Sequence, residues 1–388
     1  MSTSTLLGYP RANGDIGIRN HLLLIPTVIC ANQVCSRIMQ LVPGTIAIPH
    51  QHGCSQIGVD KDRTFEVLAG MGKNPNVGGV IIVSLGCEVV NPDELSDAIR
   101  VTGKPVEAFD IQSVGGSVKA IKHGVELAGK MLSELNAMEK VPVPLSKLKV
   151  AVKCGGSDAT SGLASNPALG AAADALIAEG GSIVIGETTE IIGAEHVLAR
   201  RCADGDTRER LYQIVNRFEK EVERMGEDMR GGNPSPGNIA GGLSTIEEKS
   251  LGCISKCGTA PIRAVIEYAE PIPEQGLYFM DSPGNDIECV SGMSAGGAHI
   301  VCFTTGRGTP TGAAVVPVIK ITGNKRTFEK MEDNMDVDVS DMLSGTLSLE
   351  EAGKRIWQEI REVADGKWTK AELLGHQEFS INRIGPSL

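Results

Sequence analysis

Aromatic residues are scarce in this sequence and make up only 3% of its 388 residues. Because nucleic-acid bases stack on aromatic side chains, this scarcity argues against a base-stacking surface. The formal net charge of −11 also argues against non-specific binding to nucleic acid or to an anionic membrane surface. A small anionic substrate remains compatible with this charge, since a few arginines are enough to build a local positive pocket.

Long hydrophobic runs are missing as well. No segment approaches the roughly 18 apolar residues of a membrane span. The N-terminus MSTSTLLGYPRANGD has no basic segment followed by an apolar core, so it does not have the pattern of a secretory signal. We therefore expect a cytoplasmic protein whose ten cysteines are reduced. None of them forms a C-x-x-C pair, which disfavours a structural zinc finger.

The common nucleotide-binding motifs are also absent. No G-x-G-x-x-G follows the first expected strand, and the small-residue turns SPGNDIEC, NPSPGN and TTGRGTPTG lack the lysine of a P-loop. A nucleotide-dependent oxidoreductase is therefore disfavoured. The backbone N–H groups of such turns are still able to hold an anion.

The segments that are present alternate between strand and helix patterns, which is typical of a parallel sheet covered on both faces. MEKVPVPLSKLK, at 138–149, has the composition of a linker. We predict an α/β fold of two Rossmann-like parallel-sheet units, an N-terminal domain at 1–140 and a C-terminal domain at 141–388. The expected strands are HLLLIPTVIC, TIAIPH, VGGVIIVSLGCE and PVEAFDI in the first, and LKVAVKC, SIVIGE, LYFMD, AHIVCFTTG and VVPVIKITGN in the second.

Two further segments stand out in the second unit. RGGNPSPGNIAGGLSTIEEKSLG, at 230–252, is rich in glycine, proline and asparagine, and we predict that it forms a long irregular loop at the active site. The acidic stretch 328–342 and the helical stretch 348–363 are expected to form a solvated flank.

Several expected strands end on side chains that can carry chemistry. In open α/β sheets, ligands bind beyond the carboxyl ends of the strands. Thiolates suit iron, zinc or iron–sulfur clusters, and imidazole or carboxylate groups can complete the shell. The alternative for each thiol is simple packing in the core, and Cys253 with Cys257 is a weaker metal candidate. We predict these metal ligands: Cys54, Cys87 and Cys154, with His50 or Glu190.

Base and substrate contacts are expected at the same strand ends. His52 or His196 is the predicted base, because neutral imidazole accepts protons near pH 7; for His196 a surface or capping role is the alternative. Arg307, between two glycines, suits a carboxylate or a sulfonate. The predicted substrate-binding residues are Arg19, Ser157, Asp158, Asn166, Lys256 and Arg307, with solvent-exposed loop cations as the alternative for Arg19 and Lys256.

Together, several segments resemble the altronate/galactarate dehydratase family, in the family's order from residue 8 to about residue 324. These segments are GYPRANGDIGIRNH, HQHGC, NPNVGGVIIVSLGCE, KCGGSDATSGLASNPALG, GETTEIIGAEH, NPSPGNIAGGLSTIEEKSLG, SPGND and FTTGRGTP. One-chain members carry a small SAF-type domain ahead of this region, and because the resemblance begins at Gly8 we expect this chain to lack that domain. The resemblance therefore implies a large subunit whose partner is a small SAF-domain polypeptide, and we expect an oligomer. Cys257 and His52 depart from many sugar-acid dehydratases.

The resemblance also implies a reaction. A base removes the proton α to the carboxylate of a small anionic 2-hydroxy acid, a leaving group departs from the next carbon, and a 2-keto acid forms. The leaving group is sulfite in one branch and hydroxide in the sugar-acid dehydratases. The implied cofactor is iron(II), with a three-cysteine iron–sulfur cluster as the alternative. A non-catalytic metal-containing subunit is disfavoured, because the strand-end polar groups all lie in this chain.

Overall fold

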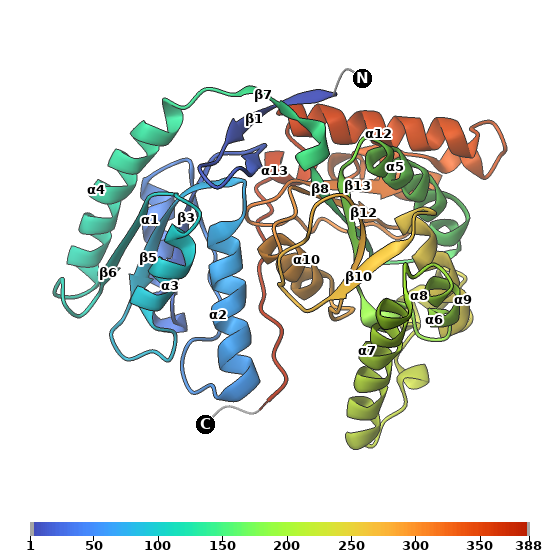
Figure 1. The fold of residues 1–388 in the computed structure, drawn as a ribbon, viewed down its shortest axis with the longest axis horizontal. Helices are drawn as coiled ribbons and strands as arrows, with labels where there is room; N and C mark the ends of the chain where they lie inside the picture. Colours follow the sequence, from blue (N-terminus) through green and yellow to red (C-terminus); the bar gives the residue numbers. More distant parts are fainter. Residues whose placement is uncertain (1–3, 386–388) are drawn as a thin grey trace.

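The computed structural model describes residues 4–385 and shows two lobes, each built on a parallel sheet (Figure 1). In the first lobe the strand order is β4-β3-β5-β6. Helices α1 and α4 cover one face of this sheet, and α2 and α3 cover the other. The elements are β3 (His21–Pro26), α1 (Asn32–Leu41), β4 (Thr45–Ala47), α2 (Gly58–Lys73), β5 (Val77–Ser84), α3 (Pro92–Arg100), β6 (Val106–Asp110) and α4 (Ser117–Asn136).

The second lobe contains a seven-stranded sheet of order β10-β11-β9-β8-β12-β13-β14, in which every pairing is parallel. Along this order the chain runs outward from β8 through β9 and then returns to the other side with β12. The topological switch point therefore lies between β8 and β12. The strands are β8 (Lys149–Cys154), β9 (Ser182–Ile185), β10 (Ile262–Ile266), β11 (Gly276–Met280), β12 (Ile300–Thr304), β13 (Val318–Thr322) and β14 (Val337–Asp338).

Helices cover both faces of this sheet. On one face α5, α7 and α12 pack on alternate side chains such as Val150 and Val152. On the other face α10 packs on Ala151, Val301 and Phe303, and this core continues into the first lobe because α10 also packs against α2. The helices are α5 (Asn166–Ala178), α6 (Glu195–Ala199), α7 (Gly205–Arg224), α8 (Pro236–Ala240), α9 (Ile246–Ile254), α10 (Asp286–Ala295), α11 (Lys325–Lys330), α12 (Leu349–Asp365) and α13 (Lys370–Leu373).

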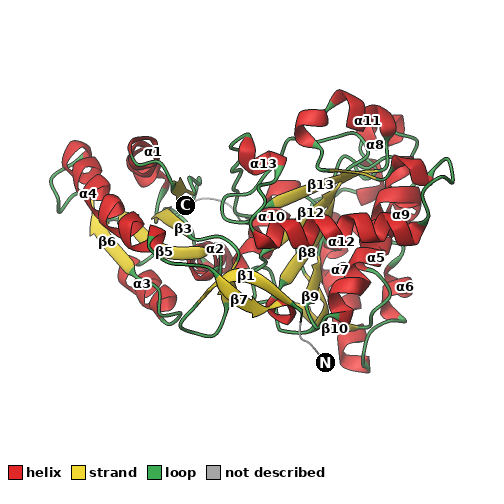
Figure 2. Ribbon diagram, turned by 90° about the horizontal axis from the view of Figure 1, so that it is seen from above, coloured by secondary structure: helices red, strands yellow, loops and turns green. Residues whose placement is uncertain are grey.

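A small antiparallel sheet lies between the lobes (Figure 2). Its order is β2-β1-β7, with β1 (Thr5–Pro10), β2 (Ile16–Gly17) and β7 (Val141–Pro144). The expected linker thus supplies an edge strand, where prolines are tolerated because one side of the strand needs no partner. At the other end of the chain, the segment after α13 returns to the first lobe, where Ile384 N donates to the Asp60 carboxylate at 2.8 Å.

Two local predictions need correction. The stretch 230–252 is more ordered than its composition suggests, because Ser235 and Thr245 cap the short helices α8 and α9. The prediction of a solvated flank at 328–342 and 348–363 is wrong. Met335 and Val337 are buried beside β13, and α12 buries an apolar face against α5. Charged residues alternate with these apolar positions, so the overall composition of the segments suggests exposure although one face is buried.

Within residues 4–385, no helix combines the length and the apolar character that a membrane crossing requires.

Candidate active site

The loops after β8 and β12 meet at the switch point of the seven-stranded sheet. Gly155 N donates to Thr304 O at 3.1 Å, and Arg307 N donates to Gly156 O at 2.9 Å. A Cβ on Gly306 would lie 2.0 Å from an oxygen of Asp158, so only glycine allows the two loops to approach this closely. The predicted residues of the GGSD turn and of TTGRG are thus brought together.

Cys154 ends β8 and lies almost fully buried at this junction. Its Sγ is 2.9 Å from Ser157 Oγ and 3.6 Å from the Asn166 amide nitrogen. That amide donates to Gly252 O at 3.0 Å, and its oxygen accepts from Thr304 Oγ1 at 2.5 Å. Because these bonds fix the orientation of the amide, its N–H side faces the sulfur, and the three predicted residues form one polar floor.

Asp158 holds the turn rather than facing open space. Its Oδ1 accepts from the backbone N–H groups of Thr160 and Ser161, and its Oδ2 accepts from Asn324 at 2.8 Å. The chain then makes a π-helical turn, Ser161–Ser165, before α5 begins. Such turns are frequent at functional sites. With these acceptor positions used, we assign Asp158 the task of shaping the loop.

Behind Cys154 lies a buried cluster of ionised groups. The Glu187 carboxylate, which follows β9, accepts from Lys153 Nζ, from Lys256 Nζ at 2.8 Å and from Cys154 N at 3.2 Å. Lys153 also pairs with Asp286 at 2.8 Å. All three members of the Lys153–Glu187–Lys256 cluster are essentially inaccessible to solvent, and a buried charge survives only when it is paired in this way.

The pKa values of the cluster keep it charged. Burial raises the pKa of Glu187, but the charges of Lys153 and Lys256 outweigh it, and the net pKa is lowered. Burial lowers the pKa of Lys256, but the charges of Cys253 and Glu187 raise it further than burial lowers it. Lys256 Nζ also donates to Cys253 Sγ at 2.5 Å. Two ammonium groups therefore stand behind the polar floor at neutral pH.

The Gly/Pro-rich segment 230–252 packs against the residues that follow β9. Lys249 Nζ donates to Glu190 Oε1 at 2.9 Å and to Asn233 Oδ1 at 2.7 Å. Asn238 donates to Ser157 O at 2.9 Å. The segment 230–252 therefore contacts the floor directly, as expected of a functional segment.

Arg307 stands at the rim of this site. Its side chain is exposed, and within residues 4–385 its guanidinium makes no hydrogen bond or ion pair. It lies over α8, where a Cβ added to Gly237 would be 3.9 Å from Arg307 Nε. A free guanidinium at a switch point is well placed to bind an anion.

Other predicted residues lie in the first lobe, in the loops after β4 and β5. His50 Nε2 donates to Pro26 O at 2.7 Å while its Nδ1 accepts from His52 N, so both ring nitrogens are used. His52 Nε2 donates to Ile381 O at 3.1 Å, and its buried Nδ1 has no partner among the described residues. Cys54 and Cys87 are exposed, on loops joined by the bond from Val89 N to Gly53 O.

The predicted ligands were Cys54, Cys87 and Cys154 with His50 or Glu190, and the described residues do not bring these side chains together as one metal site. Cys54 and Cys87 lie on loops that follow strands of the four-stranded sheet, whereas Cys154 is the last residue of β8 in the seven-stranded sheet and contacts Ser157. Glu190 is paired with Lys249. Within residues 4–385, no three His, Cys, Asp or Glu side chains are grouped as metal ligands. Iron(II) and the iron–sulfur cluster stay predictions.

Two more predicted residues lie apart from the floor. Arg19 pairs with Glu372 at 2.8 Å and donates to the carbonyls of Val363 and Lys367, so it ties α12 and α13 to the N-terminal segment. His196 is an exposed residue of α6. Lys153, Glu187 and Lys249 were not predicted as site residues. A lysine inside the apolar strand VAVKC was the available signal, because lysine is rarely buried unless it is paired.

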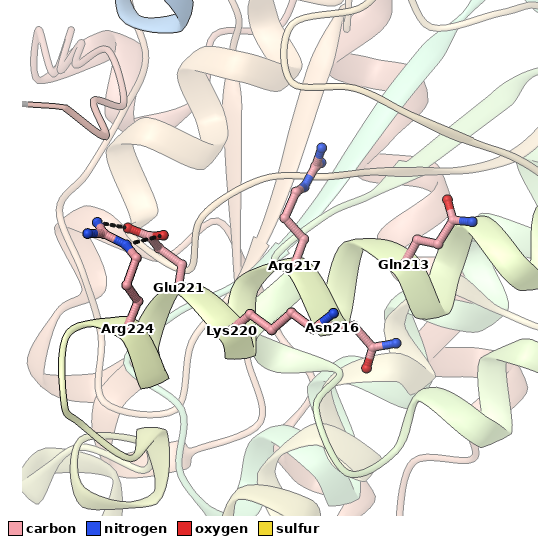
Figure 3. Close-up of a pocket in the computed structure, with 6 residues that line it drawn as sticks. All are labelled: Gln213, Asn216, Arg217, Lys220, Glu221 and Arg224. Atoms are coloured by element: carbon pink, nitrogen blue, oxygen red, sulfur yellow. Dashed lines mark hydrogen bonds and ion pairs between the residues drawn. The ribbon is translucent and has the colours of Figure 1, made fainter.

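A separate hollow of about 480 Å³ lies on the surface of α7 (Figure 3). Figure 3 shows Gln213, Arg217 and Lys220 fanning out from one helix, with Arg224 paired to Glu221. Because all its lining side chains come from a single helix, we do not assign a site there.

Comparison with known proteins gives consistent matches along the chain. Residues 145–387 match the family described as D-galactarate/Altronate dehydratase, C-terminal, and residues 8–136 match D-galactarate dehydratase/Altronate hydrolase, second domain. The chain is 40% identical over 382 residues to (2R)-sulfolactate sulfo-lyase subunit beta of Chromohalobacter salexigens, which covers 98% of this chain and 97% of the relative.

The dehydratases are matched over a smaller share of their length. Altronate dehydratase of Bacillus subtilis is 36% identical over 395 residues, covering 99% of this chain and 78% of the relative. Galactarate dehydratase (L-threo-forming) of Escherichia coli is 32% identical over 383 residues, covering 94% of this chain and 73% of the relative.

Proposed function

The chain belongs to the D-galactarate/altronate dehydratase family and is a lyase, and from this premise we propose that it is the large subunit of an enzyme that eliminates sulfite from (2R)-sulfolactate to give pyruvate. The observation that carries the choice of substrate is the near end-to-end match with the sulfo-lyase subunit, at the highest identity of the matches described. The dehydratases extend well beyond the matched region.

The site suits a small anionic substrate. Sulfolactate has a carboxylate and a sulfonate, one at each end of a three-carbon chain. Arg307 offers free N–H donors at the rim for one of these groups, whereas the Lys249 ammonium is paired with the Glu190 carboxylate. We assign one anionic end to Arg307 and place the reacting carbons over Cys154, Ser157 and Asn166.

We propose that a base, for which His52 and His196 are the predicted candidates, takes the α-proton, and its loss places negative charge on the substrate carboxylate. Preorganised positive groups in a water-poor site stabilise such a developing charge. We propose that Lys153 and Lys256, held charged behind Cys154 by Glu187 and Asp286, supply such positive groups next to the polar floor. Sulfite then leaves as a stable anion, and the resulting enol tautomerises to pyruvate.

A small partner subunit carrying a SAF-type domain is part of this proposal. Its support is the name of the relative, a subunit beta. We also propose that the two large-subunit domains meet near residue 140, in agreement with the family matches ending at 136 and beginning at 145.

The test is a comparison of substrates with the two-subunit enzyme, purified without oxygen and supplied with iron(II). Racemic sulfolactate, altronate and galactarate are offered separately, and sulfite and 2-keto acid are measured together. Sulfite and pyruvate released in equal amounts are the expected result. Keto acid from a sugar acid, without sulfite from sulfolactate, would replace the proposal with a two-subunit hydro-lyase, which the altronate dehydratase match favours as second candidate.

A further inference from the structure

The backbone conformation of Glu187 is unusual for a buried residue other than glycine. Its φ and ψ are 69° and 66°, in the left-handed region, and it is fully inaccessible to solvent. Two hydrogen bonds hold this conformation: Ser282 Oγ accepts from Glu187 N, and Glu187 O accepts from Glu190 N, both at 2.8 Å. Glycine adopts this conformation without strain. A glutamate in this place therefore indicates that the carboxylate itself is needed.

The carboxylate joins three elements at the switch point. It accepts from Lys153 at the end of β8, from the Cys154 backbone, and from Lys256, which follows α9. Lys153 has a second carboxylate partner in Asp286, but within residues 4–385 Glu187 is the only carboxylate paired with Lys256. The position of the Lys256 ammonium, and its contact with Cys253, therefore depend on Glu187.

Asp286 also pairs with the buried Lys153 ammonium group, but Glu187 is the carboxylate that contacts Lys153 and Lys256 together, directly behind Cys154. We infer, on the basis of the proposed function, that Glu187 is a positioning residue of the lyase. Its strained backbone places the carboxylate so that it holds the Lys153 and Lys256 ammonium groups against the floor formed by Cys154. Glu187 acts through the two lysines and does not touch the substrate.

The test uses the two-subunit enzyme and the variants Glu187→Gln and Glu187→Asp. The amide keeps the size of the side chain but not its charge, so kcat should fall by about 100-fold, while KM changes less than threefold because Arg307 still binds the substrate. Aspartate keeps the charge but is one methylene shorter, so it should recover part of kcat. The matched control is Asp336→Asn, a partly buried carboxylate beside β13 that accepts from the backbone of Lys320 and Lys370; its kcat should match that of the wild type.

Crystal structures of the wild type and Glu187→Gln supply a second readout that needs no substrate. Lys256 Nζ should leave Cys253 in the variant, and an unmoved ammonium would overturn the positioning role. Activity is measured on whichever acid the wild type converts. Release of keto acid without sulfite would therefore contradict the proposed substrate but not this inference, whereas a Glu187→Gln enzyme with wild-type kcat would contradict this inference alone.

Discussion

Buried histidines make the stability of this fold sensitive to mild acid, and His299 shows why. The residue precedes β12 and lies in the core between the lobes. Its Nδ1 accepts from Lys149 N at 3.0 Å, and its Nε2 donates to Ile16 O at 2.7 Å. A proton on Nδ1 removes the acceptor and places a charge in the core. Burial accordingly lowers the pKa of His299 from 6.5 to about 4.

The direction of the pH effect follows from this lowered pKa. Because the unfolded chain binds the proton more tightly than the folded chain, the stabilisation is complete above about pH 6.5 and is lost as the pH falls toward 4. With these two pKa values, linkage gives a loss of about 2 kcal/mol in the free energy of unfolding between pH 7 and pH 5. His21 and His50, whose pKa values burial also lowers to about 4, add losses in the same window.

Chemical denaturation of the wild type and of His299→Gln at pH 7 and pH 5 isolates this contribution. Glutamine does not titrate, and it breaks the two buried hydrogen bonds at both pH values. The wild type should be the more stable protein at pH 7, and its advantage should shrink by about 2 kcal/mol at pH 5. An advantage that is equal at both pH values would refute the assignment of a neutral, hydrogen-bonded imidazole.

Three further predictions concern the loops and the rim. Gly53→Ala should lower the free energy of unfolding by about 2–3 kcal/mol, because its Cβ would lie 2.1 Å from Thr27 O. The control Gly58→Ala has open space around it and should cost only about 1 kcal/mol. Equal losses of stability in thermal unfolding would contradict this prediction. Asn166→Ala should cost about 1–3 kcal/mol in chemical denaturation, because partners in three elements lose a buried amide; an unchanged midpoint would argue against this network. Arg307→Lys should raise KM about tenfold by loss of a bidentate contact with no change in melting temperature; an unchanged KM would remove Arg307 from the substrate contacts.

Much of the architecture follows from local pattern. The continuous apolar run of β5 and the strand patterns that end at Cys154 and Thr304 predict buried parallel strands, and the structure has them. Because carboxyl ends of parallel strands share an edge, the convergence of Cys154, Ser157 and Asn166 follows from the strand–turn–helix pattern alone. The two-residue strand β14 was missed, since it depends on pairing with β13 rather than on its own composition.

The candidate site was harder to predict because the sequence does not say how the strand ends of one sheet are placed relative to those of the other. Cys54 and Cys87 look equivalent to Cys154 as strand-end thiols, yet they follow strands of the other sheet. The role of Glu187 was hidden for a different reason. Its left-handed backbone and its two lysine partners come from elements far apart in the chain, and no local pattern encodes such a meeting.

The central claim, that the lyase works at the switch point between β8 and β12, is tested most directly by a crystal structure of the two-subunit enzyme with 3-sulfopropanoate, an analogue of sulfolactate without the 2-hydroxyl group. The account predicts that the ligand lies over Cys154 and Ser157 with one anionic group on Arg307. A ligand bound instead beside Cys54 and Cys87, at the edge of the four-stranded sheet, would contradict it.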